Sequence, residues 1–223
     1  RSQLAGAGTN TAALAFGGSG PSALTEKWNG TNWTEVNDLN TARNQLSGAG
    51  TNTAALAFGG VLPSPERATA ITESYNGTNW SEVNDLNTAR LRGAGAGTQT
   101  SALAFGGQTP STPIFALTEL WNGTNWTEVN DLNTARRELA GAGSSNTNAL
   151  AISGSSNKTT ESWNGTNWTE VGDINNLKND AGAAGTNTAA IAFGGESPSA
   201  GGTNSAVTET FNAGPATVTF DNS

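Results

Sequence analysis

The sequence of 223 residues contains no cysteine, no histidine and no methionine. Without cysteine it can form neither a disulfide nor a thiolate metal site. Without histidine it lacks the commonest metal ligand and the commonest general base. We therefore expect no cofactor, no bound metal and no catalytic activity. Because the chain starts at Arg1 without a methionine, we also expect a processed product or a piece of a longer protein.

Charge is also scarce, at 13% of residues, and the formal net charge is −8. Nucleic-acid binding needs clustered lysine and arginine, and the sequence has no such cluster. A membrane-spanning helix needs about 18 consecutive apolar residues, and no such run occurs. We therefore expect neither nucleic acid as a partner nor membrane insertion.

What the chain does contain is one repeat in five copies. The string WNGTNWTEVNDLNTAR at residues 28–43 returns at residues 121–136, with close variants between and after them. A second string, AGAGTNTAALAFGG at residues 5–18, recurs between these copies. If a basic residue starts each unit, residues 1–223 form a single domain of five units, at about 1–42, 43–89, 90–135, 136–177 and 178–223.

Each unit predicts four short strands, which in the first unit are residues 4–8, 12–16, 24–28 and 33–36. The Asn-Gly pair before the last strand is the strongest short hairpin signal. Four strands in each unit of about 40–50 residues predict an all-β fold, a five-bladed β-propeller with four antiparallel strands per blade. We expect the last unit to end in its own fourth strand, residues 216–220, so that no strand is exchanged between the termini.

The second strand of the first unit has one bulky face and one small face. Leu14 and Phe16 share one side of the strand, and Ala13 and Ala15 share the other. Such faces suit a sheet that stacks between two neighbouring sheets. The first strand consists mainly of glycine and alanine, as expected for the crowded strand beside the propeller axis.

The repeat resembles the kelch repeat. In the second unit the matching features are a glycine doublet at residues 59–60, Tyr75, Trp80 and Arg90. The resemblance covers essentially the whole chain. It departs in the fourth unit, which has Ser-Gly at residues 153–154, and in the fifth unit, which lacks the tryptophan of the fourth strand. The near-identity of the copies also resembles kelch-like repeat proteins of marine bacteriophages, which implies a virion or extracellular surface.

A glutamate recurs in every third strand, on the same side of the strand as its apolar neighbours. A buried carboxylate is costly unless it is paired, and each unit also begins with a cation. A catalytic acid would be single rather than repeated around a ring. We therefore predict structural ion pairs that join Glu26, Glu73, Glu119, Glu161 and Glu209 to Arg1, Arg43, Arg90, Arg136 and Lys178.

Three other repeated features have both a functional and a structural interpretation. The Asn-Gly-Thr and Asn-Trp-Thr triplets match N-glycosylation acceptors, but Asn-Gly also suits tight turns. The aromatic pair Trp28 and Trp33 suits either sugar stacking or packing within the blade. Asp38 and its counterparts suit either calcium or an Asx turn. Repetition in four units or more favours the structural interpretation each time.

The copies differ mainly in the loop after the glycine doublet and at the two positions after each starting cation. In a kelch-type blade both places would lie at one end of the central channel. A ligand without five-fold symmetry requires such differences, although neutral drift in loops would also produce them. The predicted ligand-binding residues are Gln3, Asn44, Gln45, Glu66, Arg67, Arg92, Arg137, Glu138, Asn179 and Asp180.

These patterns favour a non-enzymatic recognition module that binds a glycan or a cell-surface protein. It would act as an adhesin-like or lectin-like part of a phage fibre or bacterial surface protein, at an extracellular or virion surface. The alternative is a structural module that contacts only other virion or fibre subunits. A glycosidase would need two carboxyl groups about 5–9.5 Å apart, and its only candidates, Glu138 and Asp180, lack supporting residues.

Overall fold

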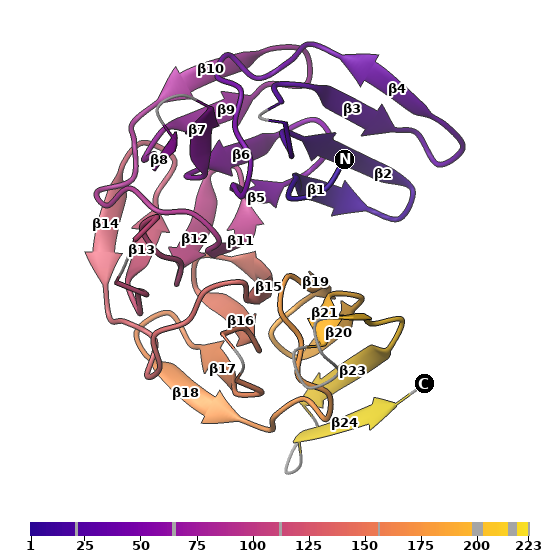
Figure 1. The fold of residues 1–223 in the computed structure, drawn as a ribbon, viewed down its shortest axis with the longest axis vertical. Helices are drawn as coiled ribbons and strands as arrows, with labels where there is room; N and C mark the ends of the chain where they lie inside the picture. The colour runs from indigo at the N-terminus through magenta and orange to yellow at the C-terminus, as the bar shows by residue number, and fades with distance from the viewer. Residues whose placement is uncertain are drawn as a thin grey trace.

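The computed structural model describes residues 1–20, 22–63, 66–111, 113–155, 157–197, 203–213 and 218–222. Within these residues the regular structure is all β. Five antiparallel sheets of four strands each surround a common axis (Figure 1). The chain is therefore a five-bladed β-propeller, as the repeat predicted.

In each blade the strands run outward from the axis in chain order. Blade one contains β1 (Ala5–Thr9), β2 (Ala12–Phe16), β3 (Thr25–Trp28) and β4 (Trp33–Val36). Blade two contains β5 (Ser47–Gly50), β6 (Ala55–Phe58), β9 (Thr72–Tyr75) and β10 (Trp80–Val83). Blade three contains β11 (Ala94–Thr98), β12 (Ser101–Phe105), β13 (Thr118–Trp121) and β14 (Trp126–Val129). Blade four contains β15 (Ala140–Ser145), β16 (Asn148–Ile152), β17 (Thr160–Trp163) and β18 (Trp168–Val171). Blade five contains β19 (Gly182–Gly185), β20 (Ala189–Phe193), β23 (Thr208–Ala213) and β24 (Val218–Asn222).

The loops after the glycine doublets of blades two and five form additional small hairpins. These are β7 (Val61–Pro63) with β8 (Glu66–Ala68), and β21 (Glu196–Ser197) with β22 (Thr203–Asn204). The last strand, β24, pairs with β23 of its own blade, so no strand is exchanged between the termini. The sequence predicted this strand at residues 216–220, of which residues 216–217 lie outside the described part of the chain.

Successive blades pack through two complementary faces. The rear face of blade one consists of Phe16, Gly17 and Thr25, and the front face of blade two consists of Leu46, Glu73 and Trp80. Phe16 meets the Trp80 ring edge-on, with 5.0 Å between ring centroids, and the Trp80 indole Nε1 donates to the Thr25 hydroxyl. The Leu46 side chain packs directly on Gly17, where a Cβ atom would come within 2.7 Å of it.

Two further junctions repeat the aromatic and indole contacts. Phe58 meets Trp126, and Phe105 meets Trp168, at the same centroid distance of 5.0 Å. The indole groups of these tryptophans donate to Thr72 and Thr118 of the preceding blade. The stacking of bulky on small faces that the second strand predicted therefore forms the core between the blades.

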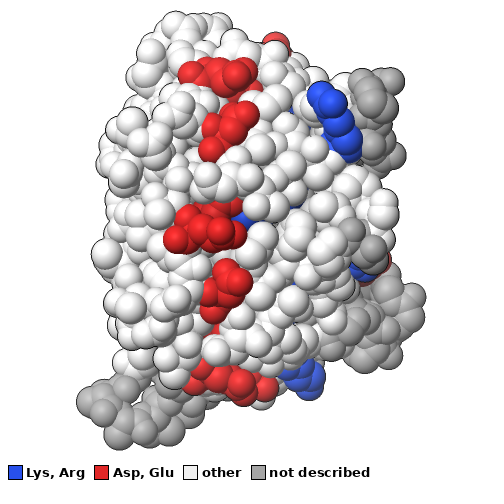
Figure 2. All heavy atoms as spheres, turned by 90° about the vertical axis from the view of Figure 1, so that its left-hand side faces the viewer, with Lys and Arg blue, Asp and Glu red and all other residues white. Residues whose placement is uncertain are grey.

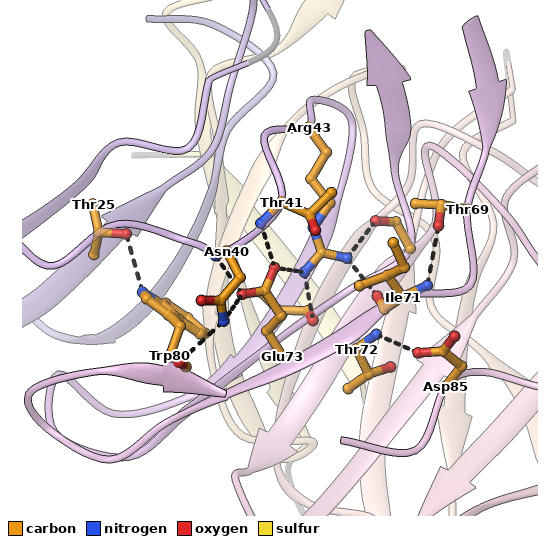
Figure 3. A network of polar contacts seen from close by, with 12 residues as sticks. Thr25, Asn40, Thr41, Arg43, Thr69, Ile71, Thr72, Glu73, Trp80 and Asp85 are labelled. Atoms are coloured by element: carbon orange, nitrogen blue, oxygen red, sulfur yellow. Dashed lines mark hydrogen bonds and ion pairs between the residues drawn. The ribbon is translucent and has the colours of Figure 1, made fainter. Parts of the chain in front are cut away.

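Glu73 lies at the centre of a polar network that ties two blades together (Figure 3). Its carboxylate is fully buried and pairs with the Arg43 guanidinium at 3.1 Å. It also accepts hydrogen bonds from the backbone N–H groups of Asn40 and Thr41, in the segment that leads out of blade one. Arg43 in turn donates to the Ile71 and Gly59 carbonyls. One carboxylate thus connects its own blade to the linker that leaves the preceding blade.

The same network recurs in most units. Glu119 pairs with Arg90, and Glu161 pairs with Arg136 at 2.7 Å, all within buried side chains. In blade one Glu26 pairs with Arg1, but 43% of the glutamate side chain is exposed.

Blade five replaces the arginine with a lysine. The Lys178 ammonium donates to the Gly194 and Val207 carbonyls and to the Ser205 hydroxyl. Its single nitrogen cannot donate to these oxygens and to the Glu209 carboxylate together, as an arginine guanidinium does with its several N–H groups. Burial lowers the pKa of Lys178, and the nearby Glu209 carboxylate opposes this effect. Glu209 itself is buried and accepts the backbone N–H groups of the linker before it.

The outer edge of the propeller carries most of the visible negative charge (Figure 2). The outermost strands β4, β10, β14 and β18 are sheet edges, and each carries an exposed glutamate. Charged side chains on an edge strand oppose pairing with a strand of another molecule. This acidic edge therefore accounts for much of the net charge without defining a site.

Candidate binding site at the channel mouth

One end of the central channel is encircled by five equivalent residues, one from each blade. Their φ angles lie between 51° and 58°, in the left-handed region that residues other than glycine rarely adopt. In blades two to five the backbone N–H of this residue donates to the carbonyl of its counterpart in the preceding blade, at 2.8 to 3.0 Å. The residues of this mouth ring are Gln3, Gln45, Arg92, Glu138 and Asp180.

The mouth ring opens into a cavity of about 740 Å³ at the end of the channel. All five side-chain positions line it, and they come from the second position after each starting cation. The repeat therefore supplies a common backbone, while the sequence supplies two amides, one guanidinium and two carboxylates. The site is polar, and none of the described residues that line it is aromatic.

The charged side chains of the mouth ring are arranged unevenly. Arg92 donates to Gln45 Oε1 at 2.9 Å and forms an ion pair with Glu138. Partial removal from water and then the Glu138 carboxylate raise the pKa of Asp180, and Arg92 opposes this effect. Blades one and two thus contribute neutral amides, and blades three to five contribute interacting charges.

The first positions after the cations have a different role from the mouth ring. Asn44 and Asn179 form backbone bridges with Val61 and Glu196, the first residues after the glycine doublets. Both variable regions therefore lie at the same end of the channel, as the sequence predicted. Arg137 contacts Gln108 and lies 3.5 Å from Glu138, so it supports the ring from outside the cavity.

The loop that lines the cavity is not the one from which the sequence predicted the ligand-binding residues Glu66 and Arg67. Arg67 is exposed on β8, and the hairpin of β7 and β8 does not contribute to the described lining. The side chain of Glu66 lies outside the described part of the chain. Instead Glu196, Asn204 and Ser205, from the loop of blade five, line the cavity. The length of that loop was the only available signal in the sequence.

The other repeated polar residues have structural partners. Asn29 accepts the backbone N–H groups of Thr31 and Asn32, which closes the turn between the outer strands. Asp38 accepts the N–H of Thr25 at the start of the third strand. Equivalent bonds recur in blades two to four, at Asn76, Asn122, Asn164, Asp85, Asp131 and Asp173.

A scan against models of known protein families found no match to this chain, and a search of curated proteins also found none. The described residues include no cluster of three or more acidic side chains that could hold a metal ion. They also include no apolar helix of membrane-spanning length. The interpretation of the site therefore depends on the geometry of this chain alone.

Proposed function

We propose that this propeller is a non-enzymatic recognition module that binds a glycan or a surface protein at the channel mouth. The observation that carries the proposal is the mouth ring. Five positions share one backbone conformation and are joined in succession by four backbone hydrogen bonds, yet they carry four different kinds of side chain. Most ligands lack five-fold symmetry, so a repeat must vary its side chains to recognise one.

The chemistry of the cavity favours a ligand that is bound through hydrogen bonds. Amides, a guanidinium and carboxylates surround about 740 Å³ of space, which is within the range of small-ligand sites. Hydroxyl groups of a sugar or the polar groups of a protein loop would match these donors and acceptors. We expect weak binding at each site and stronger binding when several copies are displayed together.

The wider assignment follows from the repeat. The glycine doublets, paired aromatic residues and starting cations support a kelch-type repeat, and the near-identical copies support a phage fibre or bacterial surface protein. We propose an extracellular or virion-surface location on the same grounds. The alternative, a structural module of a virion or fibre, is favoured by one specific observation: Trp33 of blade one and Phe193 of blade five are 49% and 41% exposed on the faces that their equivalents bury against a neighbouring blade.

The test compares the chain with a variant whose mouth ring is uniform. Replacing Arg92, Glu138 and Asp180 by glutamine gives all five positions the same side chain. Glutamine already adopts the required φ at Gln3 and Gln45, so the fold should persist. On a glycan array and a panel of bacterial surface proteins, we expect the parent, displayed as a tetramer, to bind and the uniform variant to lose at least about tenfold in affinity, or about 1.4 kcal/mol.

The matched control changes three outer charges instead, with Glu82, Glu128 and Glu170 each replaced by glutamine. It should bind like the parent, because these side chains lie on the outer edge. If the uniform variant also binds like the parent, the recognition surface lies elsewhere. If the parent binds nothing on either panel, the structural alternative is favoured.

A further inference from the structure

The front face of blade one has no neighbouring blade against it. Trp33 is 49% exposed, whereas its equivalents Trp80, Trp126 and Trp168 are 4–5% exposed. Leu4 is 38% exposed, whereas its equivalent Leu46 is 6% exposed. Among the described residues no linker donates to Glu26 as Asn40 and Thr41 donate to Glu73. Among the described residues, the contacts that Leu46, Glu73 and Trp80 make with the preceding blade and its linker therefore have no counterpart on this face.

The rear face of blade five is uncovered in the matching way. Phe193 is 41% exposed, whereas its equivalents Phe16, Phe58 and Phe105 are 0–2% exposed. A Cβ atom on Gly194 would meet open space, whereas on Gly17 it would meet Leu46 of the next blade. Phe193 instead lies over Gly182 of its own blade.

The mouth ring is open at the same place. Backbone hydrogen bonds join its members from Gln3 through to Asp180. No corresponding bond joins Gln3 to Asp180 in the described part of the chain. Figure 1 accordingly shows blades one and five on either side of an opening in the ring. The two uncovered faces flank this opening.

We propose that the opening is the seat of a sixth blade, one further repeat unit in line with the other five. A blade of this repeat carries both of the required faces. Its tryptophan and leucine would cover Phe193 and Gly194, with its indole donating to Thr208. Its own phenylalanine would cover Trp33, and the Asn-Thr of its linker would donate to Glu26. Three junctions within the chain already share the phenylalanine–tryptophan contact, the indole hydrogen bond to threonine and the bond from the linker asparagine N–H to the glutamate.

A second copy of the chain fits the opening less well. It would offer its front face to the rear face of the first copy, and would leave another front face and another rear face uncovered. Such head-to-tail contacts close only if the rotation happens to complete a circle. A single blade covers both faces at once.

The test adds a copy of residues 37–89, a linker and one complete unit, after Ser223. Hydroxyl-radical footprinting then reads the exposure of each tryptophan by mass spectrometry. Trypsin cleaves after Lys27 and Arg43, which separates the blade-one peptide from its near copies. In the parent, Trp33 should be labelled about tenfold faster than Trp126, in line with exposed fractions of 49% and 5%. In the six-unit chain the two rates should become similar.

Matched substitutions add an independent measurement. Phe193→Ala should leave the melting temperature of the parent nearly unchanged and should lower that of the six-unit chain clearly. Phe58→Ala, at an internal junction, should lower both. These results do not depend on ligand binding, so they are separate from the test of the mouth ring.

Three results would overturn the proposal. The first is a parent monomer in which Trp33 is already protected, because blades one and five then meet directly. The second is protection that grows with the concentration of the parent, which would identify a second copy as the occupant. The third is a folded six-unit chain in which Trp33 is labelled as fast as in the parent.

Discussion

At the scale of single residues, the chain uses the same side chain in surroundings that differ from blade to blade. Glu73 and Glu26 occupy equivalent positions in their units, yet one is fully buried and the other is 43% exposed. Thr118 and Thr160 are both buried, yet only Thr118 accepts an indole N–H. Such pairs are internal controls, because the local sequence is almost constant and the neighbouring blade changes.

Replacing the buried glutamate should cost far more than replacing its exposed equivalent. In Glu73→Ala the Arg43 guanidinium and two linker N–H groups lose their partner in a buried place. We expect a loss of about 3–5 kcal/mol in the free energy of unfolding, measured by urea denaturation. The control Glu26→Ala should cost only about 0–1 kcal/mol, because water screens the exposed pair. Equal losses for the two variants would contradict this account of the network.

The hydroxyl groups of two equivalent threonines should also differ in their contribution to the free energy of unfolding. In Thr118→Val the buried Trp168 indole loses its acceptor, and we expect a loss of about 1–3 kcal/mol. Thr160 has a buried hydroxyl without a partner among the described residues. The strand register explains this, because blade five has Phe220 opposite Phe211 where other blades have a tryptophan. Thr160→Val should therefore be neutral or slightly stabilising in the same urea measurement, and a large loss would show that its hydroxyl has a partner.

At the scale of strands and blades, the small residues of the first strand make room for the neighbouring blade. A Cβ atom on Gly48 would come within 2.6 Å of the Phe16 ring of blade one. Gly95 has the same relation to Phe58. Gly6, in blade one, would meet only the Leu14 carbonyl of its own blade, at 3.2 Å. The glycine is therefore required by the junction rather than by the strand.

This difference predicts the effect of alanine at the two positions. Gly48→Ala forces the Phe16 ring to move within a packed junction, and we expect a loss of about 1–3 kcal/mol. Gly6→Ala should be close to neutral. Thermal unfolding followed by circular dichroism would measure both. If Gly6→Ala costs as much as Gly48→Ala, the cause lies within the strand.

At the scale of the whole molecule, stability depends on how many neighbours each blade has. Blades two to four are each covered on both faces, whereas blades one and five are each covered on one. In repeat architectures stability is approximately a sum of unit and nearest-neighbour contributions. The channel mouth draws residues from all five blades, so the end blades also limit how well the site is held.

Amide hydrogen exchange should reveal this gradient. We expect faster exchange in β2 and β3 of blade one, and in β20 of blade five, than in β12 and β13 of blade three. Adding a sixth repeat unit should slow exchange in both end blades and leave blade three unchanged. Uniform exchange across the five blades of the parent would contradict nearest-neighbour control of stability.

Much of the fold could be predicted because the same local sequence signals recur in each unit. The Asn-Gly turns, glycine doublets and alternating faces indicated four strands per blade and the number of blades. The side of the strand on which Glu73 lies predicted its burial, because Glu73 shares that side with the apolar residues Ile71 and Tyr75 in a sheet that is stacked against its neighbours. The grouping of variable positions at one end of the channel also followed from the order of the strands.

The candidate site could be predicted only in part. The sequence treated both positions after each cation alike, but the second position lines the cavity in all five units, whereas among the first positions Ser2 alone appears in the described lining. That choice depends on the left-handed turn at Gln3 and its equivalents, which the repeat does not reveal because no glycine marks it. Likewise the loop of blade five, rather than β7 and β8, lines the cavity, because loop direction depends on tertiary packing.

By itself, the sequence determined the repeat, the order of the four strands in each blade and the residues that differ between copies. These are local properties, set by turn chemistry and by side-chain alternation. Only the tertiary structure decided which equivalent residues are buried and which are exposed, as with Trp80 and Trp33. The physical reason is that burial at a junction depends on two blades at once. The amino-acid sequence within one unit is the same whether or not a neighbouring blade covers it.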